Sequence, residues 1–392
     1  MIRKLTAALL IVALLLTGQA SASLAMEGPE TLEALAEAPA VPAPSVILIE
    51  RASGTVLAEK NADERLLPAS VTKIMTLLLT LEAVDSGLLS LEDIVTVSRA
   101  SMRMGGSTAF LAEGERYTVH ELLKAVVIAS ANDGAVALAE HLAGSQESFV
   151  GRMNQRAQEL GMVNTQFKNC HGLDEDGHYT TARDIALMSR ELLHFHPKIK
   201  EYTGIWMDSL RDGTFGLSNT NKLIRFYDGA TGLKTGSTSK AGCCLSASAE
   251  RDGMELIAVI LHAPSSDDRY EAARALLDFG FATYASLEAH PDQPLLPIPV
   301  TLGETAEVQP VLEETLHFVV EKAKIKAITR TVTLEEGISA PVAAGQQLGE
   351  LVISAGEEVL LTVPLVAAQD VARLTFGTVL GRMLRLLVLG LR

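Results

Sequence analysis

A serine and a lysine that could react together stand in the tetrapeptide Ser70-Val-Thr-Lys73. On a helix, side chains three positions apart lie on one face, so the lysine amine would reach the serine hydroxyl. A serine hydroxyl is a weak nucleophile until a neighbouring base takes its proton. Lysine can be that base where burial and nearby positive charge keep it neutral near pH 7. The pair therefore predicts Ser70 as a nucleophile and Lys73 as its general base.

The same spacing occurs again in Ser237-Thr-Ser-Lys240, so it also arises by chance. The first copy follows a proline and opens a strongly apolar helical pattern, whereas the second lies in a stretch rich in glycine and serine. The context favours Ser70 and Lys73 as the reactive pair.

A hydroxyl and an amide stand two residues apart in Ser130-Ala-Asn132, at a break between two helical stretches. In a non-helical turn both side chains can point into one site. Ser130 could relay a proton to a leaving group, and the Asn132 amide could hold a substrate carbonyl. Ordinary turn chemistry explains the same residues, because Ser, Asn, Asp and Gly favour such breaks.

A cation and a hydroxyl precede a predicted β-hairpin in Lys234-Thr-Gly236. On an edge strand they suit a substrate carboxylate, and the glycine leaves room for a substrate backbone. A solvated lysine at a strand edge is the simpler alternative, since edge strands often carry lysine.

Periodic patterns predict a mixed α/β region that positions these motifs. Strand-like stretches stand near both of its ends and amphipathic helices lie between them. Thr118 and Glu121 have the spacing of a helix capping box. The expected elements are strands at 45–50 and 55–58, helices at 70–85, 118–142 (interrupted at 130–134), 148–160 and 181–193, a hairpin of 243–249 and 254–262, and a closing helix at 269–279.

The rest of the chain changes in character. Helical patterns disappear after about residue 284, and short β-prone stretches alternate with turns, as in a small all-β module. These stretches are 296–301, 316–320, 327–334, 347–353 and 358–363. The tail from Asp370 is helical again, with Arg382, Arg385 and Arg392 on one side, opposite Phe376 and Leu387. This pattern predicts a helix in a membrane interface, and the alternative is a final helix packed on the β module.

The N-terminus has the features of a secretory signal peptide. Arg3 and Lys4 precede the apolar run 5–17, and small residues follow at 20–25. We therefore expect a signal peptide at 1–25 and an exported protein; a retained N-terminal anchor is the alternative. Residues 26–44 are rich in Ala, Glu and Pro and predict an extended linker.

Composition limits the function further. The 392 residues contain 33 Lys and Arg against 48 Asp and Glu, a formal net charge of −15. Binding of nucleic acid relies on basic residues, so a nucleic-acid partner is not expected. The three cysteines, Cys170, Cys243 and Cys244, have no spacing typical of a disulfide framework or a zinc site. We interpret them as small apolar packing residues.

Taken in order, S-x-x-K, S-x-N and K-T-G form the set used by penicillin-binding proteins and serine β-lactamases. From about residue 45 to 365 the chain resembles the low-molecular-mass penicillin-binding proteins, the D-alanyl-D-alanine carboxypeptidases of serine peptidase family S11. The matching stretches are PASVTKIMT (68–76), SAND (130–133), NCHGL (169–173), YTTARD (179–184), NTN (219–221) and KTGSTSKAGCCL (234–245).

The resemblance implies an α/β (α+β) serine β-lactamase/penicillin-binding-protein-like transpeptidase fold, followed by a small all-β domain and a C-terminal amphipathic helix. The expected divisions are a signal peptide at 1–25, a linker at 26–44, a catalytic domain at 45–283, an all-β domain at 284–366 and a membrane-anchoring helix at 367–392. The enzyme would lie at the outer face of the cytoplasmic membrane.

The resemblance also implies a role for each motif. The enzyme would release the terminal D-alanine of peptidoglycan stem peptides through an acyl-enzyme, and β-lactams would acylate it covalently, with no cofactor or metal. Backbone N–H groups of Ser70 and Ser237 would form the oxyanion hole. The remaining roles are acylation of Ser70, proton abstraction by Lys73, proton relay by Ser130, peptide positioning by Asn132, substrate binding along Gly236 and Ser237, and carboxylate binding by Lys234, Thr235 and Arg269.

The motifs also suggest other functions. A class A β-lactamase would need a glutamate in an E-x-x-L-N loop, but Glu159 and Asn164 have the wrong spacing, and residues 160–170 contain no carboxylate. A non-catalytic peptidoglycan-binding scaffold would not need the intact pair of Ser70 and Lys73. Endopeptidase or transpeptidase activity would use the same acyl-enzyme.

Overall fold

The structure, a computed structural model, describes residues 39–389. The predicted signal peptide and residues 26–38 of the predicted linker lie outside the described residues. The described residues include an α/β region (residues 45–283) and a β region (residues 284–367).

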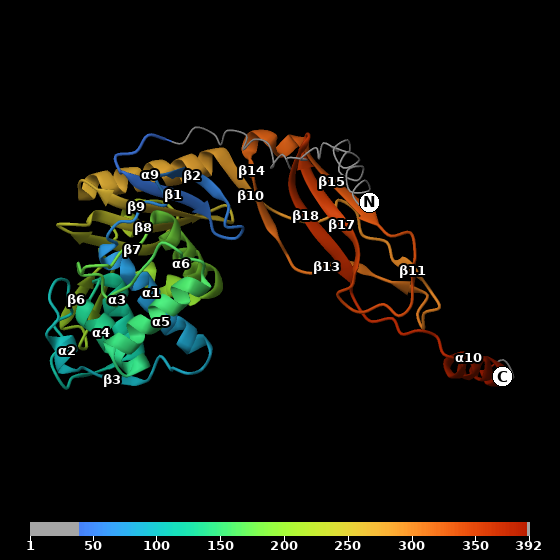
Figure 1. The fold of residues 1–392 in the computed structure, drawn as a ribbon, viewed down its shortest axis with the longest axis horizontal. Helices are drawn as coiled ribbons and strands as arrows, with labels where there is room; N and C mark the ends of the chain where they lie inside the picture. The colour runs from blue at the N-terminus through green and yellow to red at the C-terminus, as the bar shows by residue number, and fades with distance from the viewer. Residues whose placement is uncertain (1–38, 390–392) are drawn as a thin grey trace, which may run out of the picture. The chain divides into compact units, whose positions relative to one another are not determined.

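A five-stranded antiparallel sheet with the strand order β2-β1-β9-β8-β7 organises the α/β region (Figure 1). Its first two strands come from the start of the region and its last three from the end, as the sequence predicted. The strands are β1 (Ser45–Glu50), β2 (Val56–Lys60), β7 (Ala230–Thr238), β8 (Gly242–Arg251) and β9 (Met254–Ala263).

Both faces of this sheet are buried, so its central strands are almost continuously apolar. Alternate residues of β9 face opposite sides: Ile257 and Val259 join the core on the side of the inner helices, whereas Leu256 and Ala258 pack with the closing helix α9 (Ser266–Thr283). Helix α9 therefore covers one face of the sheet.

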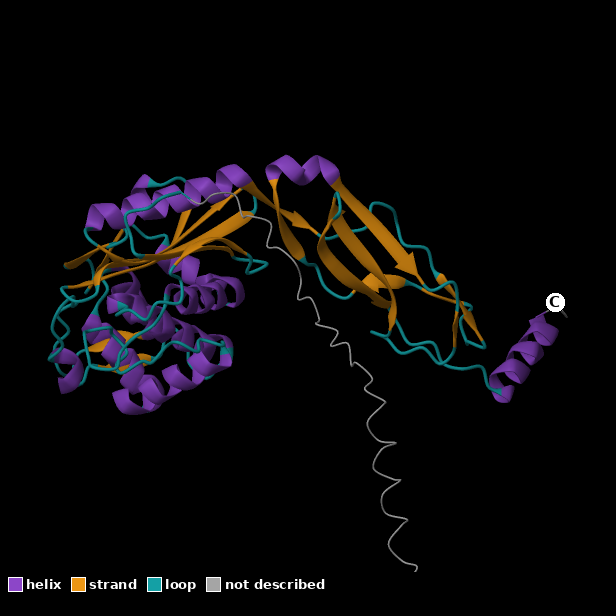
Figure 2. Cartoon of the chain, turned by 45° about the horizontal axis from the view of Figure 1, so that its top comes forward, coloured by secondary structure: helices purple, strands orange, loops and turns teal. Residues whose placement is uncertain are grey.

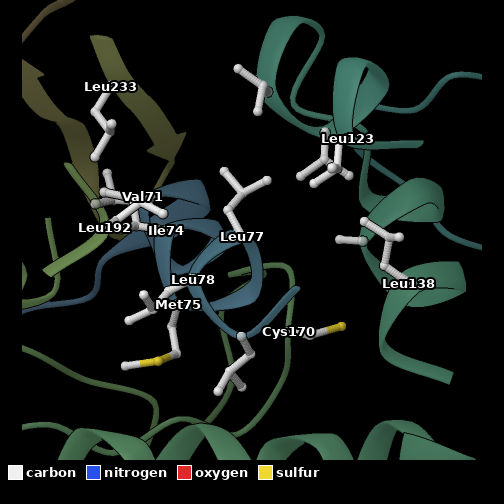
Figure 3. Packing of buried hydrophobic residues seen from close by; sticks show 14 of the residues in the cluster. Val71, Ile74, Met75, Leu77, Leu78, Leu123, Leu138, Cys170, Leu192 and Leu233 are labelled. Carbon is white, nitrogen blue, oxygen red and sulfur yellow. The ribbon is translucent and has the colours of Figure 1, made fainter. Parts of the chain in front are cut away.

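The other face carries most of the remaining helices. They are η1 (Ala69–Thr72), α1 (Lys73–Asp85), α2 (Arg99–Met102), α3 (Val119–Ile128), α4 (Asn132–Ala143), α5 (Gln146–Glu159), α6 (Ala182–Phe195), η2 (Pro197–Ile199), α7 (Lys200–Thr203) and α8 (Leu223–Phe226). Helix α1 lies in the middle of this layer, and Figure 3 shows Leu77 and Leu78 among the side chains of its neighbours.

Local sequence signals set several helix boundaries. Thr118 and Glu121 form the predicted capping box at the start of α3, and Thr181 caps α6. The predicted interruption falls between α3 and α4, where Ser130 has a positive φ of 60°. Two small two-stranded sheets were not predicted, because their strands are too short for a clear period: β3 (Ile94–Thr96) with β4 (Arg116–Thr118), and β5 (Met207–Leu210) with β6 (Phe215–Ser218).

The β region contains only strands and one short helix, η3 (Lys322–Ala327), as the colours of Figure 2 show. Its sheets have the orders β10-β14, β12-β11-β16 and β13-β18-β17-β15. The strands are β10 (Tyr284–Glu288), β11 (Ile298–Thr301), β12 (Glu307–Val308), β13 (Pro310–Leu312), β14 (His317–Glu321), β15 (Ile328–Leu334), β16 (Ile338–Ser339), β17 (Gln347–Ala355) and β18 (Glu358–Ala367).

The tail forms helix α10 (Phe376–Leu389), within the range that the sequence predicted to be helical. No helix among residues 39–389 is both long enough and apolar enough to cross a membrane.

Candidate active site

Ser70 and Lys73 lie at the junction of η1 and α1. Ser70 belongs to the single turn η1, which runs directly into α1, and Lys73 is the first residue of α1. The Lys73 Nζ lies 2.9 Å from Ser70 Oγ. The lysine side chain is fully buried, with 0% of its surface exposed. The spacing of the motif therefore produces the expected contact between amine and hydroxyl.

Two further oxygens surround the Lys73 amine. Nζ donates to Asn132 Oδ1 at 2.6 Å and to the main-chain carbonyl of His171 at 2.6 Å. The Asn132 amide is fixed in this orientation because its Nδ2 donates to the carbonyl of Gly105 at 2.7 Å. A neutral amine has two N–H groups and one lone pair. With both N–H groups donated to oxygens that can only accept, the lone pair is left for the Ser70 hydroxyl.

Burial lowers the pKa of Lys73 from its ordinary value to about 7, although the neighbouring Asp133 carboxylate acts in the opposite direction. Burial also lowers the pKa of Lys234 well below its ordinary value, with the positive charges of Lys73 and Arg269 as further causes. The environment therefore makes a neutral Lys73 accessible near neutral pH, as proton abstraction requires.

The S-x-N motif occupies the break between α3 and α4. Ser130 is buried in its positive-φ conformation, and Asn132 is the first residue of α4. The main-chain N–H of Asn132 donates to the carbonyl of Ser107 at 2.7 Å. Because one hydrogen of the Asn132 Nδ2 group is donated to Gly105, the second is the one that a substrate carbonyl could use.

Lys234, Thr235 and Gly236 lie on β7, at the edge of the sheet. The Lys234 side chain is buried and its Nζ donates to the carbonyl of Thr235 at 3.0 Å. The Thr235 hydroxyl donates to Thr220 Oγ1 at 2.7 Å. Asn221 supports the same strand, since its Nδ2 donates to the carbonyl of Gly232 at 2.7 Å.

Gly236 explains how β7 comes so close to the nucleophile. A Cβ at this position would lie 2.8 Å from the main-chain nitrogen of Ser70 and 2.9 Å from that of Val71. Real Cβ atoms essentially never come within 3.0 Å of another heavy atom. The strand can therefore pass next to the Ser70 amide only with glycine at this position.

The second S-x-x-K copy has a different environment. Ser237 is exposed near the end of β7, with its Oγ 3.8 Å from Cys243 Sγ on β8, and Lys240 is exposed in the turn between these strands. The two copies share a spacing, but only the first combines a helical turn with a buried amine.

Arg269 extends from α9 to the back of β7 and is itself buried. Its Nη1 donates to the carbonyls of Gly236 and Cys244, at 3.2 and 3.3 Å. Its Nη2 donates to Ser266 Oγ at 3.1 Å and to the Tyr270 hydroxyl at 3.3 Å. The guanidinium therefore supports the strand that carries the K-T-G motif and adds positive charge beneath it.

The segment 169–173 is part of the site, although no role was predicted for it from its residues. Gly172 has a φ of +88°, and a Cβ there would lie 1.9 Å from the carbonyl oxygen of Ala69. This close packing places the His171 carbonyl at Lys73. Burial lowers the pKa of His171 to about 3, so its ring is neutral at physiological pH.

The sequence did not reveal the main-chain acceptors of the site, the carbonyls of Gly105, Ser107 and His171. A main-chain carbonyl has the same chemistry in every residue, so no residue type marks its role. The only available signal was the resemblance itself, which includes the stretches 169–173 and 219–221.

The cysteines are all free. Cys170 and Cys244 are both buried in the core on the side of the inner helices, as predicted. Cys243 is only half-buried, although it also packs against the core under α9.

Comparison with known proteins agrees with this geometry. Residues 33–265 match a family model described as D-alanyl-D-alanine carboxypeptidase, and residues 289–373 match the C-terminal domain of penicillin-binding protein 5. The D-alanyl-D-alanine carboxypeptidase DacF of Bacillus subtilis is 42% identical over 388 residues, which cover 97% of each chain. The DacC carboxypeptidase of Escherichia coli is 36% identical over 354 residues, 86% of each chain.

Solved structures give the same result. Penicillin-binding protein 5 of Haemophilus influenzae is similar over 86% of this chain and 100% of that chain, with a TM-score of 0.78 and 28% identity. Penicillin-binding protein D2 of Listeria monocytogenes in its ampicillin-bound form is similar over 62% of this chain and 98% of that chain, with a TM-score of 0.57 and 33% identity. These matches confirm the predicted resemblance: the chain belongs to the D-alanyl-D-alanine carboxypeptidase family of low-molecular-mass penicillin-binding proteins.

Proposed function

We propose that this protein is an exported serine-type D-Ala-D-Ala carboxypeptidase. It removes the terminal D-alanine from peptidoglycan stem pentapeptides through an acyl-enzyme on Ser70. The observation that carries the proposal is the environment of Lys73: a buried amine whose two N–H groups have acceptors in Asn132 and His171, and whose third contact is Ser70 Oγ.

Acylation begins with proton transfer from Ser70 to Lys73. As Nζ takes the proton, Oγ forms a bond to the carbonyl carbon of the penultimate D-alanine. The charge that develops on the carbonyl oxygen is stabilised by the N–H groups of Ser70 and Ser237. The amide C–N bond then breaks, and Ser130 passes a proton to the amine of the departing D-alanine.

Deacylation restores the enzyme. Water attacks the ester carbon, the bond to Ser70 Oγ breaks, the shortened peptide leaves with a carboxylate, and Oγ regains a proton. A β-lactam follows the same acylation step by opening its ring on Ser70. The ampicillin-bound relative from Listeria supports this part of the proposal.

Substrate binding is assigned to β7 and its neighbours. Lys234 and Thr235 receive the terminal carboxylate, and the substrate backbone lies along Gly236 and Ser237. Asn132 positions the peptide with its remaining N–H. Arg269 contributes its charge from behind the strand, since its Nη atoms already donate to protein groups.

The test is mass spectrometry of the purified enzyme after labelling with benzylpenicillin, with D-alanine release from a D-Ala-D-Ala pentapeptide measured in parallel. We expect one adduct, on the peptide that contains Ser70, and none in Ser70→Ala. An adduct on the peptide that contains Ser237, or D-alanine release by Ser70→Ala, would refute the proposal.

The rate of penicillin release separates the carboxypeptidase from a β-lactamase. Residues 160–170 supply no carboxylate to activate water, so we expect the penicillin adduct to persist. Rapid turnover of benzylpenicillin would favour the β-lactamase alternative.

We further propose that α10 attaches the enzyme to the outer face of the cytoplasmic membrane. Apolar side chains spaced three and four residues apart form an exposed stripe on this helix, from Phe376, which is 84% exposed, to Leu387, which is 63% exposed. Such a stripe in water requires a covering surface, and a lipid interface provides one.

Deletion of residues 370–392 should release the enzyme from the membrane fraction without loss of D-alanine release. A matched control is a full-length variant with Arg382→Lys and Arg385→Lys, which keeps the charges and the apolar stripe and should stay bound. Membrane retention of the truncated protein would contradict the proposal and favour an uncleaved N-terminal anchor.

A further inference from the structure

The segment between α2 and β4 controls the orientation of Asn132. This loop, residues 103–112, supplies two carbonyls to that residue. Gly105 accepts a hydrogen bond from Nδ2, and Ser107 accepts one from the main-chain N–H, each at 2.7 Å. The position of the Oδ1 atom that faces Lys73 therefore depends on the conformation of this loop, whereas Lys73 Nζ itself is hydrogen-bonded to Ser70, Asn132 and His171.

The loop conformation has few sources of stability of its own. Gly105, Gly106 and Ser107 are exposed, and only Ala109 and Leu111 are buried. Phe110, between these two, has a positive φ of 54° although its ring is 74% exposed. This backbone conformation is unfavourable for a bulky residue and persists only where its surroundings enforce it.

Two side chains outside the loop provide that enforcement: Arg211 Nη2 donates to the carbonyl of Phe110 at 2.7 Å, and main-chain amides on both sides of Phe110 donate to the Asp133 carboxylate. This carboxylate accepts the N–H of Ala109 at 3.0 Å, the N–H of Leu111 at 3.1 Å and the N–H of Gly134 at 2.9 Å. The first two donors flank Phe110, so the positive φ at that residue brings both amides to one carboxylate. The Asp133 side chain is buried, with 1% exposed, and belongs to α4, next to Asn132 in sequence.

We propose that Asp133 is a positioning residue for the general base. Its carboxylate fixes loop 103–112, the loop carbonyls fix the Asn132 amide, and Asn132 in turn directs the Lys73 lone pair to Ser70. The inference rests on the proposed function and adds to it a residue that touches neither substrate nor the reacting atoms.

The charge of Asp133 should also affect the pH dependence of the activity. The carboxylate raises the pKa of Lys73 against the effect of burial. Lys73 also faces the Cys170 thiol, which stays uncharged at neutral pH because burial raises its pKa to about 12. It faces Lys234 and His171 as well, whose pKa values are lowered by burial and by the charge of Lys73. Neutralising Asp133 therefore shifts the acidic limb of the activity profile to lower pH.

The test compares Asp133→Asn with the wild-type full-length enzyme. An asparagine presents an NH₂ group to one of the loop amides, so the loop loses its attachment to α4 and keeps only that to Arg211. We expect kcat for D-alanine release and the rate of acylation by labelled penicillin to fall roughly 10- to 100-fold, as for a small misplacement of a catalytic group. KM should change less than threefold, the acidic limb should move to lower pH, and trypsin should cut faster at the exposed Arg103.

A second substitution tests whether Asp133 acts on Asn132 through the conformation of loop 103–112. Glycine adopts a positive φ freely, so Phe110→Gly in the Asp133→Asn background should restore a large part of kcat without restoring the position of the acidic limb. Asp133→Glu keeps the charge but moves the carboxylate, so it should lower kcat and leave the limb in place. Asp133→Glu also tests the inference if Asp133→Asn fails to fold.

Glu50 provides a matched control. It is likewise a buried carboxylate that accepts main-chain amides, those of Ala52 and Ser53, at the turn between β1 and β2. Glu50→Gln should lower the melting temperature and leave kcat and the pH profile unchanged.

A folded Asp133→Asn or Asp133→Glu variant with kcat within twofold of wild type would overturn the inference. The inference would also be overturned if Phe110→Gly restored no part of kcat in the Asp133→Asn background. A wild-type enzyme that neither releases D-alanine nor is acylated at Ser70 would instead refute the proposed function, so the two failures are distinguishable.

Discussion

The two regions of the molecule bury different kinds of side chain. Among residues 39–389, every buried Ser, Thr, Asn, His or charged side chain lies in the α/β region, and the last of them is Arg269. The cores of the β region consist of apolar residues such as Leu351 and Leu365. Burial of a polar group costs free energy unless it is hydrogen-bonded. The α/β region therefore holds the buried polar groups that a reaction needs, whereas the cores of the β region serve packing alone.

Removal of the buried amine of Lys73 should have the largest effect on the chemistry of the α/β region. Lys73→Ala should lower acylation by labelled penicillin roughly 1000-fold, because the hydroxyl loses its base. Lys240→Ala removes the exposed lysine of the second S-x-x-K copy and should change the rate less than twofold. Equal losses in both variants, measured by stopped-flow or gel labelling, would mean that burial does not distinguish the two lysines.

The close approach of β7 to η1 is the next feature to test. Gly236→Ala would place a methyl group 2.8 Å from the Ser70 nitrogen, so the strand or the helical turn must move. We expect kcat/KM for D-alanine release to fall roughly 100-fold, because a shift of about 1 Å suffices for that loss. Gly216→Ala on β6, where a Cβ meets nothing within 4 Å, is the control and should be close to wild type.

The pH dependence should reflect the buried lysine. Lys73 has a lowered pKa of about 7 and must be neutral to accept the Ser70 proton. Activity should therefore rise with pH and level off above about 7, with a loss of roughly tenfold for each pH unit below that value. Acylation rates between pH 5.5 and 8.5 provide the measurement, and a flat profile down to pH 5.5 would contradict the role of Lys73.

A cavity in the β region should leave the chemistry intact. Leu365→Ala removes a fully buried side chain from β18 and should lower the free energy of unfolding by about 2–5 kcal/mol. The kcat for D-alanine release should stay within twofold at 25 °C. The matched variant Leu77→Ala, in the core around α1 (Figure 3), should lower both stability and kcat. An inactive Leu365→Ala enzyme that is still folded would show that the β region contributes to the chemistry.

The sequence predicted the features that depend on residues close together in the chain. The capping box of Thr118 and Glu121 and the break at Ser130 involve residues close in sequence, so their positions follow from residue type. The position of Arg269 behind β7 could not be predicted, because it depends on how α9 packs on the sheet. The loop conformation at Phe110 likewise depends on Asp133, which is more than twenty residues distant in sequence.

The unequal exposure of the cysteines makes the enzyme suitable for selective labelling. Burial raises the pKa of the Cys170 and Cys244 thiols to about 12 and about 11, so neither forms a thiolate at neutral pH. Cys243 is the thiol that solvent reaches, and its sulfur lies 3.8 Å from Ser237 Oγ on the strand assigned to the substrate. A maleimide fluorophore would therefore attach at one position of the native chain, without prior engineering. Ligand binding would then be followed as a change in its fluorescence.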